Sequence, residues 1–263
     1  RAGVPSPARD ARKLMYAALE TKAFPDPGQP VPGGAATRFE TMIAQREARL
    51  PVSRILGFRA FYGRNFHVCQ DVLDPRPETE CLIDAALEQP FARVLDLGTG
   101  SGAILLTLLA ERPDAIGVCT DISEDALDTA IDNPVSVDLS DRFSLIVSDW
   151  FDRVTGRFDL IVSNPPYIRA SDMDGLQPEV RDHEPRIALT DEGDGLDAYR
   201  AITAGVMAHL KPGGRLIVEI GPDQADAVTE LFKQAGLQDV SVRPDLDGRD
   251  RVVIGRRRGN NGT

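Results

Sequence analysis

Cysteine, long apolar runs and basic charge are all scarce in this sequence, and each shortage excludes a class of protein. The 263 residues include three cysteines, which form no Cys-x-x-Cys pair and no cluster with histidine. That pattern argues against a disulfide framework and a bound metal, and it is typical of a reducing, cytoplasmic compartment. The longest apolar stretch, residues 103–110, is much shorter than the roughly 18 residues that span a bilayer, so we expect no membrane association.

Basic residues are few relative to acidic ones. Thirty Lys and Arg against 41 Asp and Glu give a formal net charge of −11 and a pI near 4.8. Such a field repels a phosphate backbone at long range, so we expect no direct nucleic-acid partner. The chain begins at Arg1 and not at Met, and its start lacks an apolar export signal. We therefore expect part of the natural N-terminus to be missing and the protein not to be secreted.

Residues 1–52 predict a small helical domain with a Pro- and Gly-rich break at 25–34. After this break apolar residues recur with the period of a helix, and Arg46 is the polar exception on their face. The apolar positions are Phe39, Met42, Ile43 and Leu50. This domain is either an N-terminal addition or a platform that docks a substrate, and the periodicity does not distinguish the two.

Residues 53–75 differ in pattern from the helical domain. Two short β-type runs, 54–58 and 61–68, are punctuated by Gly57 and Gly63, which predicts a β-hairpin that links two domains.

Residues 76–258 alternate between strand-like and helix-like segments, and 259–263 form a short tail. The alternation predicts an α/β domain with a mostly parallel sheet and helices on both faces. The expected strands are Val94–Leu97, Ile116–Thr120, Ser144–Val147, Leu160–Val162, Leu216–Ile220, Val240–Val242 and Val252–Ile254.

The first motif is a glycine loop, Asp-Leu-Gly-Thr-Gly-Ser-Gly at 96–102, which closes a strand and opens a helix. In an α/β sheet this is where a ligand meets backbone amides and a helix N-terminus. The Gly-x-Gly-x-Gly spacing differs from the Gly-x-Gly-x-x-Gly of dinucleotide clamps, so it favours a ligand with a nucleoside and no pyrophosphate. The candidate contacts are Gly98, Thr99, Gly100, Ser101 and Gly102.

Asp121 ends the next strand, 23 positions after Gly98. An acidic side chain there can accept hydrogen bonds from both ribose hydroxyls, or it can cap the helix that begins near Ser123. The glycine loop nearby favours the ribose role.

Asp149 and Trp150 follow the third strand, at the same edge of the sheet. The carboxylate of Asp149 can accept a hydrogen bond from an exocyclic amine, and the ring of Trp150 or Phe151 can cover an adenine. A buried structural tryptophan is the alternative.

The second motif is Asn164-Pro165-Pro166-Tyr167, which follows the fourth strand. Two prolines fix φ and remove both backbone donors, so the carbonyls of Asn164 and Pro165 are held outward. With the side-chain oxygen of Asn164 they form acceptors for an NH₂ group, beside the flat face of Tyr167. The alternative is a rigid turn that only ends a strand.

These acceptors suit methylation of a planar nitrogen. An amide nitrogen is a poor nucleophile because its lone pair is delocalised, and two acceptors can hold its hydrogens and aim the lone pair at an electrophile. If the electrophile is a sulfonium methyl, alignment and preorganised dipoles lower much of the barrier, and no covalent enzyme intermediate or metal is required.

Taken in order, these segments resemble those of class I S-adenosylmethionine-dependent methyltransferases and, more narrowly, of peptide chain release factor N5-glutamine methyltransferases. The tetrad alone also occurs in adenine-N6 methyltransferases, whereas the Pro-Arg-Pro-Glu-Thr-Glu segment at 75–80 is far more specific. The other segments that carry the likeness are Leu56-Gly57, Glu184–Leu189, Asp194–Arg200, Lys211–Gly214 and Gly248–Arg251.

The resemblance implies a Rossmann-like, seven-stranded methyltransferase sheet with a small N-terminal helical domain and a β-hairpin linker. It implies S-adenosyl-L-methionine as cofactor, S-adenosyl-L-homocysteine as product, and as partner a class I release factor, methylated on the glutamine of its Gly-Gly-Gln loop. We expect a monomer. The family roles, carried onto this chain, place Gly98, Gly100 and Gly102 against the methionine part of the cofactor, Asp121 on the ribose and Trp150 beside the adenine.

The resemblance makes Asn164 a contact of both cofactor and substrate, because it binds the glutamine amide near the transferring methyl. Pro165 supplies a carbonyl, and Pro166 and Tyr167 pack beside the amide. Arg76 and Glu78 are second-rank candidates, either substrate contacts or surface ion pairs of little energy. Asp74 departs from the family, which usually has an apolar residue before the proline at that position. The N-terminal part also looks shorter than the family's usual five or so helices.

Three alternatives stay open at this point. An adenine-N6 nucleic-acid methyltransferase would share the tetrad but needs a basic face. A catalytically silent module would hold the cofactor and recruit a partner. A nicotinamide-dependent dehydrogenase fits least, because the third glycine of the loop is misplaced.

Overall fold

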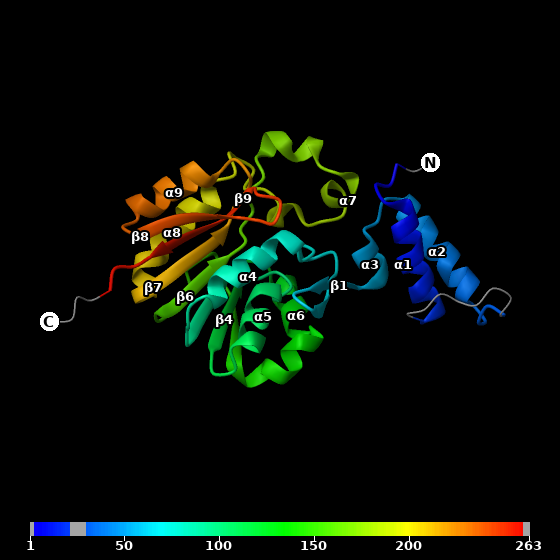
Figure 1. Cartoon of the computed structure of the whole chain (residues 1–263), viewed down its shortest axis with the longest axis horizontal. Helices are drawn as coiled ribbons and strands as arrows, with labels where there is room; N and C mark the ends of the chain where they lie inside the picture. Colours follow the sequence, from blue (N-terminus) through cyan, green and yellow to red (C-terminus); the bar gives the residue numbers. More distant parts are fainter. Residues whose placement is uncertain (1–2, 22–29, 260–263) are drawn as a thin grey trace.

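The computed structural model describes residues 3–21 and 30–259. Figure 1 shows a small helical part set apart from a larger part built on a sheet. The helical part consists of α1 (Pro7–Leu19), α2 (Ala35–Glu47) and α3 (Val52–Leu56). Residues 25–29 of the predicted break and 260–263 of the predicted tail lie outside the described residues. No helix in the described ranges is long and apolar enough to cross a membrane.

Seven strands of the described chain form the large sheet, in the order β5-β4-β3-β6-β7-β9-β8. All pair in parallel except β9, which is antiparallel to both of its neighbours. The predicted seven-stranded, mostly parallel sheet is therefore confirmed. The strands are β3 (Arg93–Leu97), β4 (Ile116–Asp121), β5 (Phe143–Val147), β6 (Phe158–Ser163), β7 (Leu210–Glu219), β8 (Gln238–Pro244) and β9 (Asp250–Arg256).

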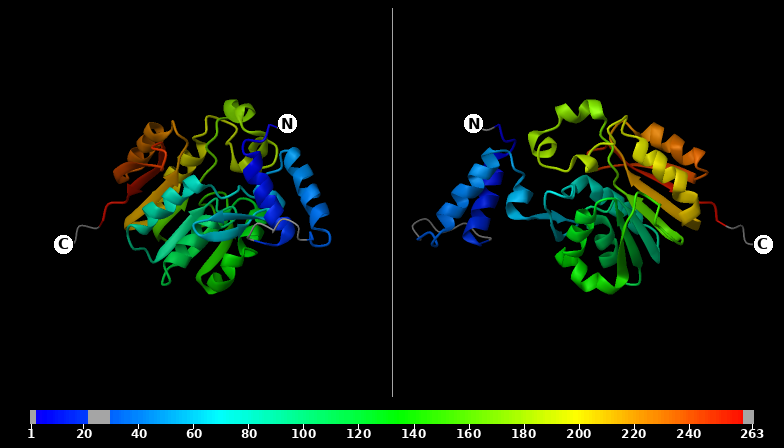
Figure 2. Two further views of the ribbon diagram at one scale, coloured as in Figure 1. Left: turned by 45° about the vertical axis from the view of Figure 1, so that its right-hand side comes forward. Right: turned by 180° about the vertical axis from the view of Figure 1, so that it is seen from behind.

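Helices cover both faces of this sheet (Figure 2). Successive strand residues point to opposite faces, so Val94 packs under α4 and α5 whereas Leu95 packs under α8 and α9. Both residues are fully buried, as expected for a parallel sheet sandwiched between helices. The helices are α4 (Glu80–Leu87), α5 (Ala103–Glu111), α6 (Glu124–Ile131), α8 (Asp197–His209) and α9 (Ala225–Gln234), and 3₁₀ helices occupy Pro77–Thr79 and Pro134–Arg142.

A hairpin joins the two parts, as predicted: β1 (Phe58–Phe61) pairs antiparallel with β2 (Arg64–His67). The preceding run 54–56, predicted as strand, is instead the end of α3. Pro51 accepts the helical hydrogen bond of Ile55, and Gly57 ends the helix in a left-handed conformation. The departure at Asp74 is explained here, because this buried carboxylate accepts a hydrogen bond from Ser53 and lies 3.2 Å from the Arg54 guanidinium.

The segment between β6 and α8 carries 3₁₀ helices at Ala170–Gly175 and Arg186–Ala188 and the short helix α7 (Pro178–Arg181), which lies on the side facing the N-terminal helices in Figure 1. Glu179 of α7 forms ion pairs with Arg46 at 2.9 Å and with Arg49 at 2.6 Å. Arg46, the polar exception of the predicted apolar face, is the most buried of the polar residues in α2 and also pairs with Asp10 at 2.9 Å. Ion pairs therefore connect the N-terminal helical part to the segment that contains α7.

Candidate active site

A cavity of about 700 Å³ opens at the carboxyl ends of β3, β4, β5 and β6. This edge is where open α/β sheets bind ligands, and the volume suits a small organic molecule. The structure brings together in its wall most of the residues predicted from the sequence, namely Arg76, Gly98, Thr99, Gly100, Ser101, Asp121, Asp149, Trp150, Asn164 and Pro166. Four predicted residues lie outside this wall: Glu78, Gly102, Pro165 and Tyr167.

The first two loop glycines face open space. Gly98 and Gly100 have φ of +69° and +54°, and a Cβ built on either would meet no atom within 4 Å. Side chains there would both strain the backbone and project into the cavity, so the loop forms a cradle that only glycine keeps clear.

Gly102 has a different reason to be glycine. Its φ is +77°, and a Cβ would lie 3.0 Å from Leu106 and 3.1 Å from Ala130. This glycine allows the start of α5 to pack against α6, and it does not line the cavity. The structure thus gives Gly102 a packing role, and its predicted contact with the cofactor stays a prediction.

Asp96, which sequence reasoning did not single out, holds the loop from below. Its fully buried Oδ2 accepts hydrogen bonds from Thr99 Oγ1 at 2.7 Å and from the Leu105 amide at 3.3 Å. Burial raises the pKa of this carboxyl to about 7, against the lowering effect of those hydrogen bonds. The sequence feature that could have pointed to Asp96 is that it is the one acidic residue within the otherwise apolar predicted strand Val94–Leu97.

Asp121 lines the cavity and connects the end of β4 to the loop. Its Oδ2 accepts from the Gly100 amide at 2.9 Å, and its Oδ1 accepts from the Ser123 amide at 3.0 Å. Burial raises its pKa, opposed by these backbone hydrogen bonds. Ser123, not Asp121, caps α6, because Ser123 Oγ accepts from the Ala126 amide. Each carboxylate oxygen of Asp121 keeps a further lone pair for a ligand.

Trp150 forms part of the cavity wall, whereas Phe151 does not. Phe151 stacks on His209 with ring centroids 4.7 Å apart, so of the two predicted aromatic rings only Trp150 is placed to cover a base. The backbone of Trp150 adopts a φ of +42°, uncommon for a bulky residue. Ser148 Oγ holds this turn by donating to the Trp150 carbonyl at 3.1 Å.

In the tetrad, Asn164 is half-buried and lines the cavity. Its Nδ2 donates to Thr79 Oγ1 at 3.3 Å. Within the described residues, its Oδ1 and the carbonyl oxygens of Asn164 and Pro165 accept no hydrogen bond. Asn164 Oδ1 can therefore accept a hydrogen bond from a ligand in the cavity. Pro165 is buried and does not line the cavity, so its role as an acceptor stays a prediction.

Tyr167 borders a second, smaller cavity of about 430 Å³, together with Glu78, Arg76, Arg251 and Glu219. Burial raises the pKa of Tyr167, so its phenol stays neutral and offers a surface rather than a base. Arg76 borders both cavities and pairs with Glu184, a buried carboxylate whose pKa burial raises to about 7 against the pull of Arg76. The alternative that Arg76 belongs to a surface ion pair is therefore wrong, because its partner is buried.

Acidic groups dominate the cavity wall. Among the described residues that line it are two arginines, Arg76 and Arg186, and seven carboxylates: Asp71, Asp74, Asp121, Asp149, Asp191, Glu192 and Asp197. Such a wall favours a cationic ligand over a phosphate.

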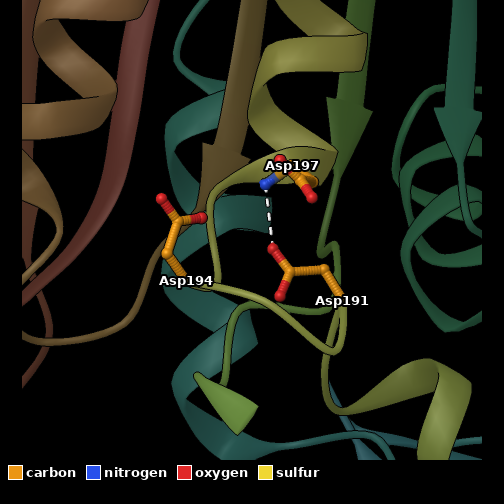
Figure 3. Close-up of side chains that lie close together, drawn as sticks. All are labelled: Asp191, Asp194 and Asp197. Atoms are coloured by element: carbon orange, nitrogen blue, oxygen red, sulfur yellow. Dashed lines mark hydrogen bonds between the residues drawn. The ribbon is translucent and has the colours of Figure 1, made fainter.

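Three carboxylates, Asp191, Asp194 and Asp197, lie within 4.8 Å of one another where the loop enters α8 (Figure 3). Asp191 accepts hydrogen bonds from the amides of Gly193, Gly195 and Asp197 at 2.8 to 3.0 Å. Asp194 and Asp197 both pair with Arg200 at 2.6 Å. The oxygens are thus engaged in folding the loop, and we assign the cluster a structural role.

The comparisons with known proteins agree with this geometry. Residues 68–177 match the family model of the methyltransferase small domain, and residues 1–57 match that of the PrmC N-terminal domain. The release factor glutamine methyltransferase of Cereibacter sphaeroides is 56% identical to this chain, covering 97% of it and 93% of the relative. This chain belongs to the release factor glutamine methyltransferase family.

Another member, from Rhodospirillum rubrum, is 45% identical and covers 98% of this chain and 81% of its own length. Among solved structures, the hMettl16 catalytic domain in complex with an RNA hairpin of the MAT2A 3′UTR has a TM-score of 0.63 at 16% identity, covering 99% of this chain and 95% of that one. That likeness shows the fold alone. Membership of the release factor glutamine methyltransferases confirms the resemblance stated from the sequence, and with it that the chain is a methyltransferase.

Sequence reasoning missed several residues that hold this methyltransferase site in place. Gln224, which directly precedes α9, donates through Nε2 to the Tyr167 carbonyl at 3.0 Å and to the Gly195 carbonyl at 2.9 Å. Thr79 and Glu219 lie behind Asn164. These partners come from distant segments. Thr79 belongs to the segment at 75–80, but that segment did not indicate a contact with Asn164, and no motif contains Glu219 or Gln224.

Proposed function

We propose that this enzyme transfers a methyl group from S-adenosyl-L-methionine to the side-chain amide nitrogen, N5, of the glutamine in the Gly-Gly-Gln loop of class I release factors. S-adenosyl-L-homocysteine is the product. The observation that carries the proposal is that one cavity joins an open glycine cradle to Asn164, whose Oδ1 has no partner among the described residues. Membership of the family supports the substrate class.

The residues present fit the cofactor. A Cβ at Gly98 or Gly100 would occupy cavity space, and the acidic wall suits a ligand that carries both a sulfonium and an ammonium group. We assign the backbone of Gly98 to Ser101 to the methionine part, Asp121 to the ribose, and Asp149 and Trp150 to the adenine. When bound, the cofactor supplies an electrophilic methyl group.

Asn164 and Pro165 prepare the acceptor nitrogen. Asn164 Oδ1 and the Pro165 carbonyl accept the two hydrogens of the glutamine NH₂ and so fix the direction of its lone pair. Holding a weak nucleophile in a near-attack geometry supplies a large part of the barrier reduction, because orientation and preorganised dipoles are set before reaction. Pro166 and the neutral ring of Tyr167 keep the carboxamide in place. Neither acceptor is basic enough to keep the proton that the nitrogen releases, so the proton passes to water.

We further propose the division of labour that the sequence suggests. Residues 1–52 dock the release factor, 53–75 link the parts, and 76–258 perform the transfer as a monomer. The location that fits a release factor as substrate is the cytoplasm. Ion pairs of Arg46 and Arg49 with Glu179 give the docking part a direct connection to the segment that follows the tetrad.

The test is incubation of the purified chain with methyl-labelled S-adenosyl-L-methionine and a class I release factor, followed by mass mapping of peptides. We expect a single added methyl group on the glutamine of the Gly-Gly-Gln loop. A release factor with Gly-Gly-Ala in that loop serves as the control and should stay unlabelled. Label on a DNA or RNA oligonucleotide, with none on the release factor, would instead identify an adenine-N6 methyltransferase, and cofactor binding with no transfer would identify a silent module.

A further inference from the structure

Asn164 can do its proposed work in only one of two orientations. A carboxamide presents an oxygen on one side and an NH₂ group on the other, and the two orientations have nearly the same shape. Only the orientation with Oδ1 toward the cavity can accept hydrogens from a substrate amide. Something in the fold must therefore select it.

The contacts of Thr79 show that this residue selects the orientation of the Asn164 carboxamide. The Thr79 hydroxyl has one proton, which it donates to Glu219 Oε2 at 2.6 Å. Its oxygen can then only accept, and it accepts from Asn164 Nδ2 at 3.3 Å. Thr79 and Glu219 are 4% and 1% exposed, so their hydrogen bond is largely shielded from solvent although each residue borders a cavity.

We propose that Thr79 and Glu219 are positioning residues that fix Asn164 with its oxygen toward the substrate amide. The proposal rests on the proposed function and deepens it. It also gives a physical task to the Pro-Arg-Pro-Glu-Thr-Glu segment, because Thr79 of that segment reaches Asn164 across 85 residues and Glu219 across 140.

We call the hydrogen-bonded series Glu219–Thr79–Asn164 the relay. It depends on the charge of Glu219. As a carboxylate, Glu219 can only accept, which forces Thr79 to donate to it. Once protonated, Glu219 can donate to Thr79 Oγ1, and the Thr79 proton is then free to point at Asn164. Asn164 would turn its Oδ1 toward Thr79 and its NH₂ toward the cavity, where it repels the substrate amide.

The surroundings of Glu219 place this change near neutral pH. Burial raises its pKa to about 7, opposed by the hydrogen bond from Thr79 and by Arg251 and Arg76. The charged and titratable groups around it come from β1, the 3₁₀ helix Pro77–Thr79 with the residue before it, α4, the tetrad, α8 and β9. They are Arg59, Arg76, Glu78, Cys81, Tyr167, Tyr199 and Arg251. Because the folded-state pKa is raised, the active relay is present above about pH 7 and is lost below it.

The first test uses Thr79→Val, which keeps the shape and removes the hydroxyl. We expect kcat on the release factor to fall about 30-fold, because misplacing a catalytic group by about 1 Å can cost on the order of 10²-fold. The dissociation constant for S-adenosyl-L-methionine should change less than about threefold. Thr79→Ser should recover most of the rate, since it restores the hydroxyl. Thr107→Val is the matched control, because Thr107 is buried in α5 away from the cavity and has no hydrogen-bond partner among the described residues.

The second test follows the relay without turnover. The side-chain ¹⁵NH₂ signal of Asn164, assigned by its loss in Asn164→Asp, should shift in Thr79→Val and return in Thr79→Ser. In the wild-type chain it should titrate near pH 7, together with an acid limb in kcat. Both changes should disappear in Glu219→Gln, which keeps an oxygen acceptor for Thr79 and has no proton to gain.

The outcomes separate the two proposals. If the wild-type chain methylates the release factor while Thr79→Val matches it in rate and in the Asn164 signal, the relay is wrong and the proposed function stands. If the wild-type chain does not methylate the release factor, the proposed function fails, and the Asn164 signal still decides the relay. An acid limb that survives unchanged in Glu219→Gln would also overturn it.

Discussion

Two corners of the same sheet edge meet in the cavity, and they are held in opposite ways. The glycine loop after β3 is fixed by backbone and carboxylate partners close in the chain, such as Asp121, which binds the Gly100 amide from 21 residues away. The tetrad after β6 is fixed by side chains from afar, Thr79 on Asn164 and Gln224 on the Tyr167 carbonyl. We call the glycine loop the cofactor corner and the tetrad the acceptor corner. The cofactor corner is thus held mainly by contacts nearby in the sequence, and the acceptor corner by contacts with distant segments.

Proline explains the difference. The glycine loop keeps its N–H groups, so neighbouring oxygens can hold it and a ligand can bind the rest. The tetrad lacks two N–H groups because of Pro165 and Pro166, so side chains of other elements hold it. The Tyr167 carbonyl accepts from Gln224, and Asn164 Nδ2 donates to Thr79. The result is that a change far from the tetrad should disturb the acceptor corner and spare the cofactor corner.

The largest expected effect comes from Asn164→Ala, which breaks the acceptor corner alone. We expect kcat to fall about 10²–10³-fold, the usual loss when one preorganised polar group is removed. The affinity for S-adenosyl-L-methionine, measured by calorimetry, should change less than about threefold because the glycine cradle is untouched. If the affinity for S-adenosyl-L-methionine fell as far as kcat, the acceptor corner and the cofactor corner would not be independent.

Next in size is the contrast between two glycines of the same loop. Gly100→Ala should weaken cofactor binding about tenfold or more, because its Cβ enters the cavity. Gly102→Ala should instead lower the free energy of unfolding by about 1–3 kcal/mol through its contacts with Leu106 and Ala130, with little change in affinity. Titration calorimetry and thermal unfolding of both variants measure the contrast. Equal losses of affinity would refute the division within the loop.

Gln224→Leu tests the clamp on the tetrad. Gln224 is buried, and its loss leaves the carbonyls of Tyr167 and Gly195 without their donor, so we expect about 2 kcal/mol less stability and a several-fold lower kcat. Gln234→Leu at the end of α9 is the control, since among the described residues the Gln234 side chain bonds only the exposed Glu230. Denaturant unfolding and steady-state rates report both effects. Cofactor affinity that fell as far as kcat would contradict the proposed independence.

The smallest expected effect concerns Glu179, which connects the acceptor side to the N-terminal helices. Burial alone would raise the pKa of this carboxyl, but hydrogen bonds from Arg49 and Arg46 lower it to about 2. A lowered folded-state pKa means that the stabilisation is full above about pH 4.5 and is lost as the pH falls toward 2.

Glu179→Gln should therefore cost about 1 kcal/mol at pH 6 and almost nothing near pH 2. Hydrogen exchange of α1 and α2 measures the cost, and Glu40→Gln at an exposed site of α2 serves as the control. A difference that did not vary with pH would rule out the ion pairs as its source. The KM for the release factor should rise, with the cofactor dissociation constant unchanged.

Much of the fold could be predicted because strong local patterns specify it. Apolar strands separated by amphipathic helices indicated all seven strands of the sheet, although β7 begins at Leu210 rather than Leu216. Residues 54–56 were predicted wrongly as strand, since Ile and Leu there are compatible with either state and the contacts of Ser53 and Arg54 with Asp74 favour the helix. The sequence marked Arg46 as a polar exception but could not indicate its role, because its partner Glu179 is 133 positions away in the sequence.

The sequence by itself determined the sheet, the two motifs and the class of chemistry, because strand period, glycine spacing and paired prolines act over a few residues. Only the tertiary structure decided which residues of those motifs face the cavity, that Gly102 packs helices, and that Thr79, Glu219 and Gln224 hold the tetrad. Those contacts join segments 57 to 140 residues apart. A hydrogen bond between such segments forms only after the chain has folded, so a local sequence pattern cannot predict it.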